Sequence, residues 1–174
     1  MYILRKSKLD DVPEMVRIAE AGRNRLKRLG IDQWQKGAYP AEKDFVSDIE
    51  KGIGYVLTDD DKPIAICAVS FDGDKAYDII DGAWLTPDKA YYAVVHRGAV
   101  APEYQGKGVA VKLLEEIFLL AREMGCISVR LDTHEENGTM RGVFERAGFS
   151  YCGVVHLYGG DCDGDPRVAY ERIL

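Results

Sequence analysis

Apolar residues recur along the chain at two spacings, and the changes between these spacings predict the order of strands and helices. Residues 2–5 alternate weakly and predict a first strand. From residue 12 onward, apolar side chains fall three or four positions apart, which is the spacing of one face of a helix. Either Asp10 or Asp11 can cap this helix, and Gly30 can end it.

A loop, a second helix and a hairpin are predicted next. Residues 31–40, IDQWQKGAYP, combine aromatic residues with turn formers and predict an irregular loop. Residues 42–51 carry their apolar residues on one side and predict a short amphipathic helix. Residues 54–57 and 63–71 predict two strands. Because the acidic segment 59–62 joins them as a turn, we expect an antiparallel hairpin.

The second half of the chain alternates strands with helices. The predicted elements are a strand at 90–100, a helix at about 108–124, a strand at 127–133, a helix at 139–147, and strands at 149–157 and 168–173. Such alternation between antiparallel pairs predicts a mixed sheet with helices on both faces. We therefore expect an α/β fold in which residues 1–174 form a single domain.

Composition and charge limit the class of protein. The 174 residues are 47% hydrophobic and 30% charged, which is ordinary for one globular domain. A net charge of −6, with one short basic cluster at Arg23–Arg28, argues against nucleic-acid binding. No apolar run approaches the ~20 residues of a membrane span, and the first residues lack the apolar core of a signal peptide. We therefore expect a cytoplasmic protein with no membrane partner.

The segment QGKGVA at 105–110 directly follows a predicted strand and begins a predicted helix. Glycine lets a backbone approach a ligand closely, and the N–H groups of a helix's first turn point toward one spot. With the helix dipole behind them, these groups suit a pyrophosphate. The spacing fits neither a P-loop nor the GxGxxG order. Taken alone, the segment would serve equally well as a plain strand-to-helix turn.

Two motifs in this region resemble those of the GNAT superfamily of acetyltransferases. Gln105, Gly108 and Ala110 match the family signature, which is Gln or Arg, two residues, Gly, one residue, then Gly or Ala. Residues 137–149 resemble the asparagine-containing helix that ends in Gly-Phe in this family. The motifs cover about residues 93–149, and the order of the strands extends the resemblance to the whole chain.

The resemblance implies a GNAT-like domain that binds acetyl-CoA as the donor. Two central parallel strands, ending at Val100 and near Thr133, would splay apart in the sheet. The pantetheine arm would pair with the first of these strands, and the pyrophosphate would lie on the glycine loop. The implied CoA-binding residues are Gly98, Ala99, Val100, Gln105, Gly106, Lys107, Gly108, Val109, Ala110, Val111 and Asn137.

The expected chemistry is direct attack of an amine on a thioester in a ternary complex. A base must take the proton of the amine, and an acid can help the thiolate to leave. In many GNAT members a tyrosine seven residues after the helix asparagine is that acid, but Phe144 occupies this position here. Either CoA leaves as a thiolate, or another group such as Tyr158 substitutes.

Three side chains are candidates for the base. Asp132 lies five residues before the helix asparagine, where the chain resembles ribosomal-alanine acetyltransferases that carry a catalytic glutamate. His96 lies on the preceding parallel strand and could form a dyad with Asp132. His134 ends the same strand as Asp132 and is the third candidate. The alternatives without chemistry are a core histidine for His96 and an ion pair of Asp132 with Arg97 or Arg130.

The acceptor is expected to bind near the early loop and near Trp84. The candidate residues are Gln33, Trp34, Tyr39 and Trp84. Aromatic residues beside carboxylates suit a cationic or amphipathic amine. The alternative is that Trp34 and Trp84 pack the edges of the core.

No metal is expected, because the histidines and Asp132 lack the short spacing that places two ligands on one element. The cysteines also lack CxxC spacing, which favours four free thiols. They are Cys67, Cys126, Cys152 and Cys162.

Other functions stay open at this point. Phe144 in place of the acid also suits a catalytically weak or inactive CoA-binding module with a regulatory role. A longer acyl-CoA donor and a peptide amino terminus as acceptor are further alternatives. An exposed strand edge near the carboxyl terminus could be covered in a homodimer with C2 symmetry.

Overall fold

The computed structural model describes residues 1–174 and confirms an α/β fold with eight strands and four α-helices. The helices are α1 (Val12–Arg28), α2 (Glu42–Glu50), α3 (Val109–Glu123) and α4 (Gly138–Arg146). The strands are β1 (Tyr2–Lys6), β2 (Gly54–Asp59), β3 (Lys62–Ser70), β4 (Asp81–Gly82), β5 (Tyr92–Val100), β6 (Ser128–Thr133), β7 (Ser150–His156) and β8 (Pro166–Ile173). Short 3-10 helices are η1 (Leu9–Asp11), η2 (Lys75–Tyr77), η3 (Pro102–Tyr104) and η4 (Gly160–Cys162).

The chain forms two compact units. The first unit comprises Met1–Val69 and His96–Ile117, and the second comprises Ser70–Val95 and Phe118–Leu174. The strand β5 and the helix α3 each contribute residues to both units. None of the helices is both long and apolar enough to cross a membrane.

The sheet is mixed and mostly antiparallel, as predicted. Its strands follow the order β1-β2-β3-β5-β6-β8-β7-β4. The parallel pair is β5 with β6, and its register joins Tyr92–Val94 to Ser128–Arg130. Beyond these residues β5 continues to Val100 and β6 continues to Thr133.

The strand edge near the carboxyl terminus belongs to β7 and not to β8. β8 pairs antiparallel with β6 on one side and with β7 on the other, and β7 also pairs with β4. Both sides of β8 are therefore satisfied by backbone hydrogen bonds, and the sheet ends at β1 and β4 instead. Because β4 pairs with β7 only at Gly153 and Val154, the rest of the outer side of β7 has no partner strand, and its cover by a homodimer stays a prediction.

In the first unit, α1 and α2 bury their apolar faces against β2 and β3. The core cluster contains Val12, Met15, Ile18, Ala19, Phe45, Val56, Ile66 and Ala101. The predicted hairpin is confirmed, since Asp59 pairs with Lys62 across a two-residue turn. Asp60 and Asp61 in this turn have φ of 47° and 65°, which matches the primed turns that suit twisted strands.

The start of α1 differs from the prediction in one detail. Asp11 occupies the cap position, but its side chain makes no capping hydrogen bond to α1. It accepts a hydrogen bond from the backbone N–H of Lys8 at 2.8 Å and pairs with Arg5 at 2.7 Å. The carboxylate therefore joins β1 to the turn before the helix. At the other end Gly30, with φ of 72°, stops the helix as expected.

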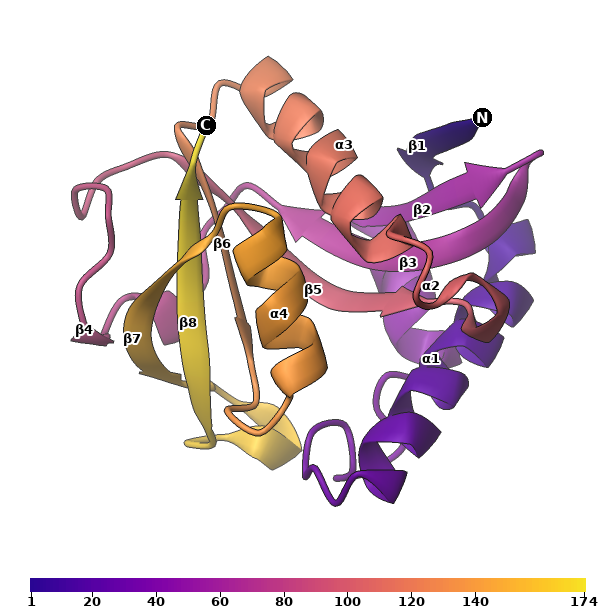
Figure 1. Ribbon diagram of the computed structural model, residues 1–174, viewed down its shortest axis with the longest axis horizontal. Coiled ribbons are helices and arrows are strands. Elements are labelled where there is room, and N and C mark those ends of the chain that lie inside the picture. The colour runs from indigo at the N-terminus through magenta and orange to yellow at the C-terminus, as the bar shows by residue number, and fades with distance from the viewer. The chain divides into compact units, whose positions relative to one another are not determined.

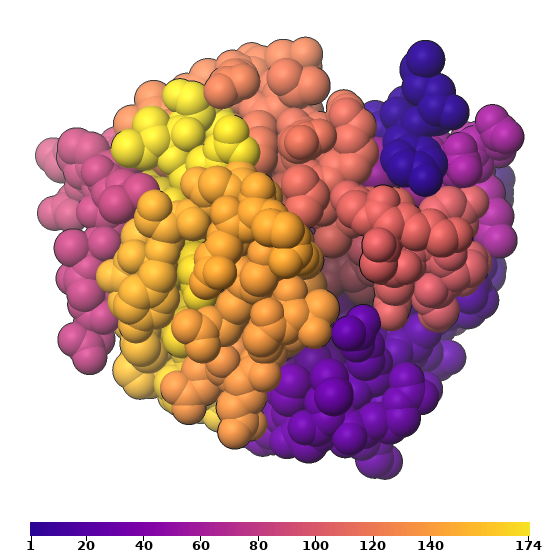
Figure 2. Space-filling model, in the orientation of Figure 1, coloured from indigo at the N-terminus to yellow at the C-terminus, as the bar shows by residue number.

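In the second unit, different elements cover the two faces of β8. Tyr170 faces α4, where its ring lies 5.3 Å from that of Phe144. The next residue, Ala169, faces the opposite side and belongs to a cluster with Tyr77 and Val155. Figure 1 shows α4 running beside β8. In Figure 2 the orange atoms of α4 hide much of β8, whose carboxyl end stays visible in yellow.

Candidate functional site

The loop between β5 and α3 has an open backbone at its glycines. Gly106 and Gly108 have φ of 74° and 78°, a region that L side chains rarely adopt. A Cβ atom at either position would meet nothing within 4 Å, and the same holds for Gly98 on β5. A ligand can therefore approach the main chain at all three positions.

The helix α3 begins at Val109, directly after this loop. The N–H groups of a first helical turn have no partner within the helix, and the helix dipole adds partial positive charge there. The first turn of α3 contains no acidic residue, and Lys107 precedes it. This end of α3 therefore suits an anion such as a pyrophosphate.

The side chain of Gln105 holds the loop in place. Its Nε2 donates to the carbonyl oxygen of Val100 at 3.1 Å. Its Oε1 accepts from Nη1 of Arg25 on α1 at 2.9 Å. The backbone N–H of Gln105 donates to the carbonyl oxygen of Pro102 at 3.3 Å. These bonds connect the loop to β5 and to α1, so they fix its start.

Asn137 caps α4. Its Oδ1 accepts from the backbone N–H of Met140 at 3.3 Å, and its Nδ2 donates to Oγ1 of Thr133 at 3.2 Å. The residue is buried. Asn137 therefore has a structural role at the start of the helix, and its predicted contact with CoA stays a prediction.

Asp132 on β6 is half-buried, and its Oδ2 accepts a hydrogen bond of 2.7 Å from the hydroxyl of Tyr77. Tyr77 ends η2 and is 2% exposed. Burial raises the pKa of Tyr77 well above its usual value, and the negative charge of Asp132 raises it further. The phenol therefore remains protonated and acts as a donor to the carboxylate.

His96 lies half-buried on β5, directly before a break in the alternation of the strand. The next residue, Arg97, has φ of 54°, so the two-residue period does not continue across it. Arg97 pairs with Asp48 on α2 through two hydrogen bonds of 2.6 and 2.8 Å, and it donates to the hydroxyl of Tyr39 at 2.9 Å. A dyad of His96 with Asp132 stays a prediction.

His134 follows the end of β6 and is half-buried. Its Nδ1 accepts from the backbone N–H of Glu136 at 3.2 Å. This nitrogen therefore holds the turn that leads to α4. Any proton transfer by His134 would have to use its other ring nitrogen, Nε2.

Phe144 is a core residue of the second unit. It is 3% exposed, and its ring lies 5.3 Å from that of Tyr170 and 5.9 Å from that of Phe149. Tyr158, the substitute acid considered above, is 69% exposed, with the Lys75 ammonium 4.9 Å from its ring. Phe144 therefore contributes packing and no proton.

The early loop is held by hydrogen bonds to α1 and β5. Gln35 donates to the carbonyl oxygens of Arg23 and Gln33 at 3.1 and 2.9 Å. Trp34 has φ of 64°, and a Cβ atom at Gly22 would lie 3.3 Å from its ring. Trp34 therefore lies close against α1 at Gly22, where a larger residue would be tightly packed against its ring.

The other acceptor candidates have structural partners. Tyr39 accepts from Arg97, and burial raises its pKa. Trp84 donates from Nε1 to the carbonyl oxygen of Tyr77 at 3.0 Å, and its ring lies 4.2 Å from the guanidinium of Arg130. Tyr92 covers the same guanidinium at 3.9 Å. Both acceptor candidates thus contribute to packing, and acceptor contact by either stays a prediction.

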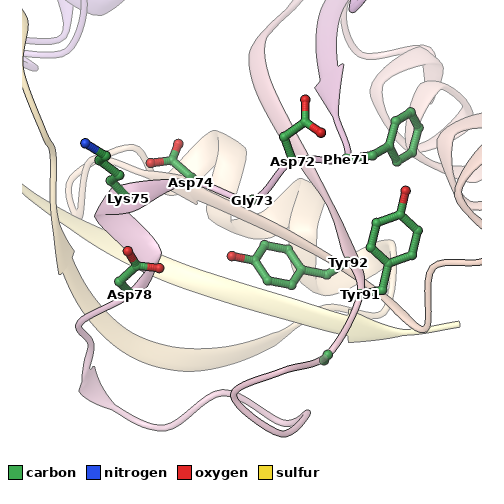
Figure 3. Close-up of a pocket in the computed structure, with 9 residues that line it drawn as sticks. Phe71, Asp72, Gly73, Asp74, Lys75, Asp78, Tyr91 and Tyr92 are labelled. Carbon is green, nitrogen blue, oxygen red and sulfur yellow. The ribbon is translucent and has the colours of Figure 1, made fainter.

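A cavity of about 430 Å³ lies in the second unit (Figure 3). It is lined by Phe71, Asp72, Gly73, Asp74, Lys75, Asp78, Ala90, Tyr91 and Tyr92. In Figure 3 the hydroxyl of Tyr92 points toward the turn at Gly73, whereas Tyr91 points toward Phe71. The Lys75 ammonium lies over the Tyr158 ring. With three carboxylates and aromatic rings, the cavity suits a cationic group.

Sequence reasoning missed the contact between Tyr77 and Asp132. The two residues are 55 positions apart and lie on elements of different type, so no local spacing connects them. The only available signal was the aromatic content of the long segment before β5.

No group of three or more His, Cys, Asp or Glu side chains that could hold a metal ion occurs in the structure. Its four cysteines are free.

Known proteins resemble the chain in sequence and in structure. A model of the acetyltransferase (GNAT) family matches residues 19–149. A GNAT-family acetyltransferase from Streptococcus agalactiae 2603 superposes with a TM-score of 0.89 at 30% identity, over 99% of this chain and 95% of that one.

Two more distant structures share the fold. The ribosomal-protein-S18-alanine N-acetyltransferase from Escherichia coli has a TM-score of 0.65 at 19% identity, over 99% of this chain and 94% of that one. A chain of the NatC complex bound to Gag peptide and CoA has a TM-score of 0.66 at 14% identity, over 99% of this chain and 98% of that one.

Proposed function

The chain belongs to the acetyltransferase (GNAT) family, and from this premise we propose that it is an acetyl-CoA-dependent N-acetyltransferase. The acceptor is a primary amine, on a small molecule or at a peptide amino terminus, that attacks the donor directly in a ternary complex. The observation that carries the proposal is the glycine loop before α3, whose backbone at Gly106 and Gly108 is open to a ligand.

Acetyl-CoA brings the activated acyl group, and the first unit supplies groups that suit its phosphate and pantetheine parts. The backbone from Gln105 to Val111 would hold the pyrophosphate, because it joins the open glycines to the first turn of α3. The backbone of Gly98–Val100 would pair with the pantetheine arm. These three residues are only half-buried, and the space above Gly98 is open, which supports the assignment.

The reaction forms a carbon–nitrogen bond and breaks a carbon–sulfur bond. The amine nitrogen attacks the thioester carbonyl carbon, the sulfur leaves as the CoA thiolate, and the nitrogen gives up one proton. We assign Asp132 as the base that takes this proton, because it is a half-buried carboxylate held by a fixed donor. His96 and His134 remain the alternative bases.

The thiolate leaves without a tyrosine acid at the usual position. Phe144 cannot donate a proton, and its ring packs against those of Tyr170 and Phe149. Because thiols ionise near pH ~8.5, a thiolate is a tolerable leaving group near neutral pH. The proposed mechanism therefore needs a base to deprotonate the amine but no acid to protonate the leaving thiolate.

Two observations limit the classes of amine that could serve as the acceptor. The carboxylates and aromatic rings of the cavity in Figure 3 suit a cationic amine. Among the structures that share the fold, the E. coli protein is named as a ribosomal-protein-S18-alanine N-acetyltransferase, and the NatC complex is bound to Gag peptide and CoA. A peptide amino terminus is therefore tested beside small cationic amines.

The proposal also covers the partners, the cellular location and the oligomeric state of the protein. A net charge of −6 supports a protein without a nucleic-acid partner. A cytoplasmic location and a C2 homodimer are the expected setting.

The test is thermal melting with and without acetyl-CoA, followed by release of free thiol with a panel of amines and peptides. Ligand that binds only the folded state raises the melting temperature. Each assay needs a blank without acceptor, because Cys162 is only partly buried and adds thiol signal. Stabilisation with thiol release for one acceptor supports the proposal and identifies the acceptor class. No stabilisation at saturating acetyl-CoA would contradict it.

One observation favours a second function, a CoA-binding regulatory module with little or no turnover. Phe144 stands where many family members carry the acid. Stabilisation by acetyl-CoA without thiol release for any amine or peptide would favour this module over the enzyme.

A further inference from the structure

We propose that Tyr77 is a positioning residue for the base, whose phenol fixes the direction in which the Asp132 carboxylate faces the amine. The role rests on the proposed N-acetyltransferase function, which assigns Asp132 as the base. Tyr77 ends η2 and donates its hydroxyl proton to Oδ2 of Asp132 at 2.7 Å. A charge-assisted bond of this length is among the stronger hydrogen bonds in proteins.

The phenol of Tyr77 cannot turn away from Asp132. Its ring lies 5.2 Å from the ring of Trp84, and the indole N–H of Trp84 donates to the carbonyl oxygen of Tyr77 at 3.0 Å. Its other neighbours in the same core cluster include Val94 and Val155, both 0% exposed. Asp74 also caps η2 by accepting from the N–H of Ala76 at 2.8 Å. The donor is therefore held by packing on one side and by a cap on the other.

The phenol serves as a donor and not as a proton source. Burial, with the negative charge of Asp132, keeps the pKa of Tyr77 well above its usual value. The hydroxyl proton stays on the phenol and is engaged in the hydrogen bond to the carboxylate. Tyr77 therefore does not replace the acid that is missing at Phe144, and it acts on the reaction through Asp132.

The direction of the carboxylate matters for the proton transfer. The last side-chain torsion of an aspartate is broad, so an unheld carboxylate samples many orientations. Holding Oδ2 removes most of that freedom before the amine arrives. A carboxylate that is already oriented lowers the activation free energy of proton transfer, because its conformational entropy is lost during folding and not during the reaction.

The experiment is a double-mutant cycle on acetyl transfer with Tyr77→Phe, Asp132→Asn and the combined variant. Tyr77→Phe keeps the ring and removes only the donor, and we expect kcat to fall about tenfold. Asp132→Asn should lower kcat about a hundredfold or more. KM for acetyl-CoA should change less than about twofold in each. Because Tyr77 acts through Asp132, the combined variant should be no slower than Asp132→Asn alone.

Tyr170→Phe is the matched control. Tyr170 is also a buried tyrosine of the second unit, and its hydroxyl accepts a bond of 3.0 Å from the charged Arg141. It lies on the other face of the sheet from Ala169, the register partner of Asp132. We expect it to lose stability as Tyr77→Phe does while kcat stays within about twofold.

The outcomes separate the positioning role from the proposed function. A Tyr77→Phe protein with the kcat of the unchanged protein, or losses that multiply in the combined variant, would overturn the positioning role alone. An unaffected kcat in Asp132→Asn would overturn the base assignment and, with it, the role of Tyr77. No thiol release by the unchanged protein with any acceptor would overturn the proposed function together with this role.

Discussion

At the scale of single residues, Glu171 on β8 shows how a fully buried charge is stabilised. Its side chain is 0% exposed, and it accepts from Ser128 at 2.6 Å, from the hydroxyl of Thr86 at 2.5 Å and from Arg130 at 2.9 Å. The backbone N–H groups of Leu85 and Thr86 add two more bonds. One carboxylate thus joins β8 and β6 to the segment before β5.

Replacing Glu171 by Gln should lower the free energy of unfolding by about 3 kcal/mol, because it leaves the buried Arg130 without its counter-charge. Burial alone would raise the pKa of Glu171, but bonds from Ser128, Thr86 and Arg130 lower it overall. A lowered pKa contributes stability that is present above the unfolded value, ~4.3, and is lost as pH falls through the folded value. Urea denaturation at pH 7 and pH 4 measures both effects.

The variant should therefore lose less stability on acidification than the unchanged protein does. The exposed Glu115→Gln serves as the control, and its unfolding curve should move by less than about 0.5 kcal/mol. Equal stability of Glu171→Gln and the control at pH 7 would show that the buried network contributes little.

At the scale of elements, the glycine loop before α3 can be tested with a control from the other end of the same helix. Gly108 has φ of 78° and Gly125 has φ of 80°, and a Cβ at either meets nothing within 4 Å. Alanine at each position carries the same left-handed strain, which costs about 1 kcal/mol. Both variants should lose similar stability, but only Gly108→Ala should weaken acetyl-CoA binding, by about tenfold, in calorimetric titration. Equal affinities in the two variants would contradict the loop assignment.

The elements that sequence reasoning predicted are those with a local cause. The hairpin of β2 and β3 follows from two apolar runs and an acidic turn, and α1 follows from a stripe at helical spacing ended by Gly30. The place of β8 inside the sheet and the contact of Tyr77 with Asp132 depend on segments that meet only after folding. No spacing in one sequence encodes such contacts, so the open glycine loop before α3 could be predicted and the partner of Asp132 could not.

At the scale of the whole molecule, the two compact units share two elements. β5 gives Tyr92–Val95 to one unit and His96–Val100 to the other, and α3 divides at Ile117 in the same way. A strand or helix that loses half of its packing partners is not stable alone in water. Unfolding of either unit should therefore remove support from the other, as expected of the single domain predicted for residues 1–174.

The two tryptophans allow this cooperativity to be measured, because Trp34 lies in the first unit and Trp84 in the second. Trp84→Phe leaves a reporter of the first unit, and Trp34→Phe leaves a reporter of the second. In each variant, urea unfolding followed by fluorescence should coincide with unfolding followed by circular dichroism. Acetyl-CoA at a hundred times its Kd should stabilise both reporters by about 2.7 kcal/mol, although its proposed phosphate site lies in the first unit only. If the ligand moved the Trp34 transition and left that of Trp84 in place, the units would be separate domains.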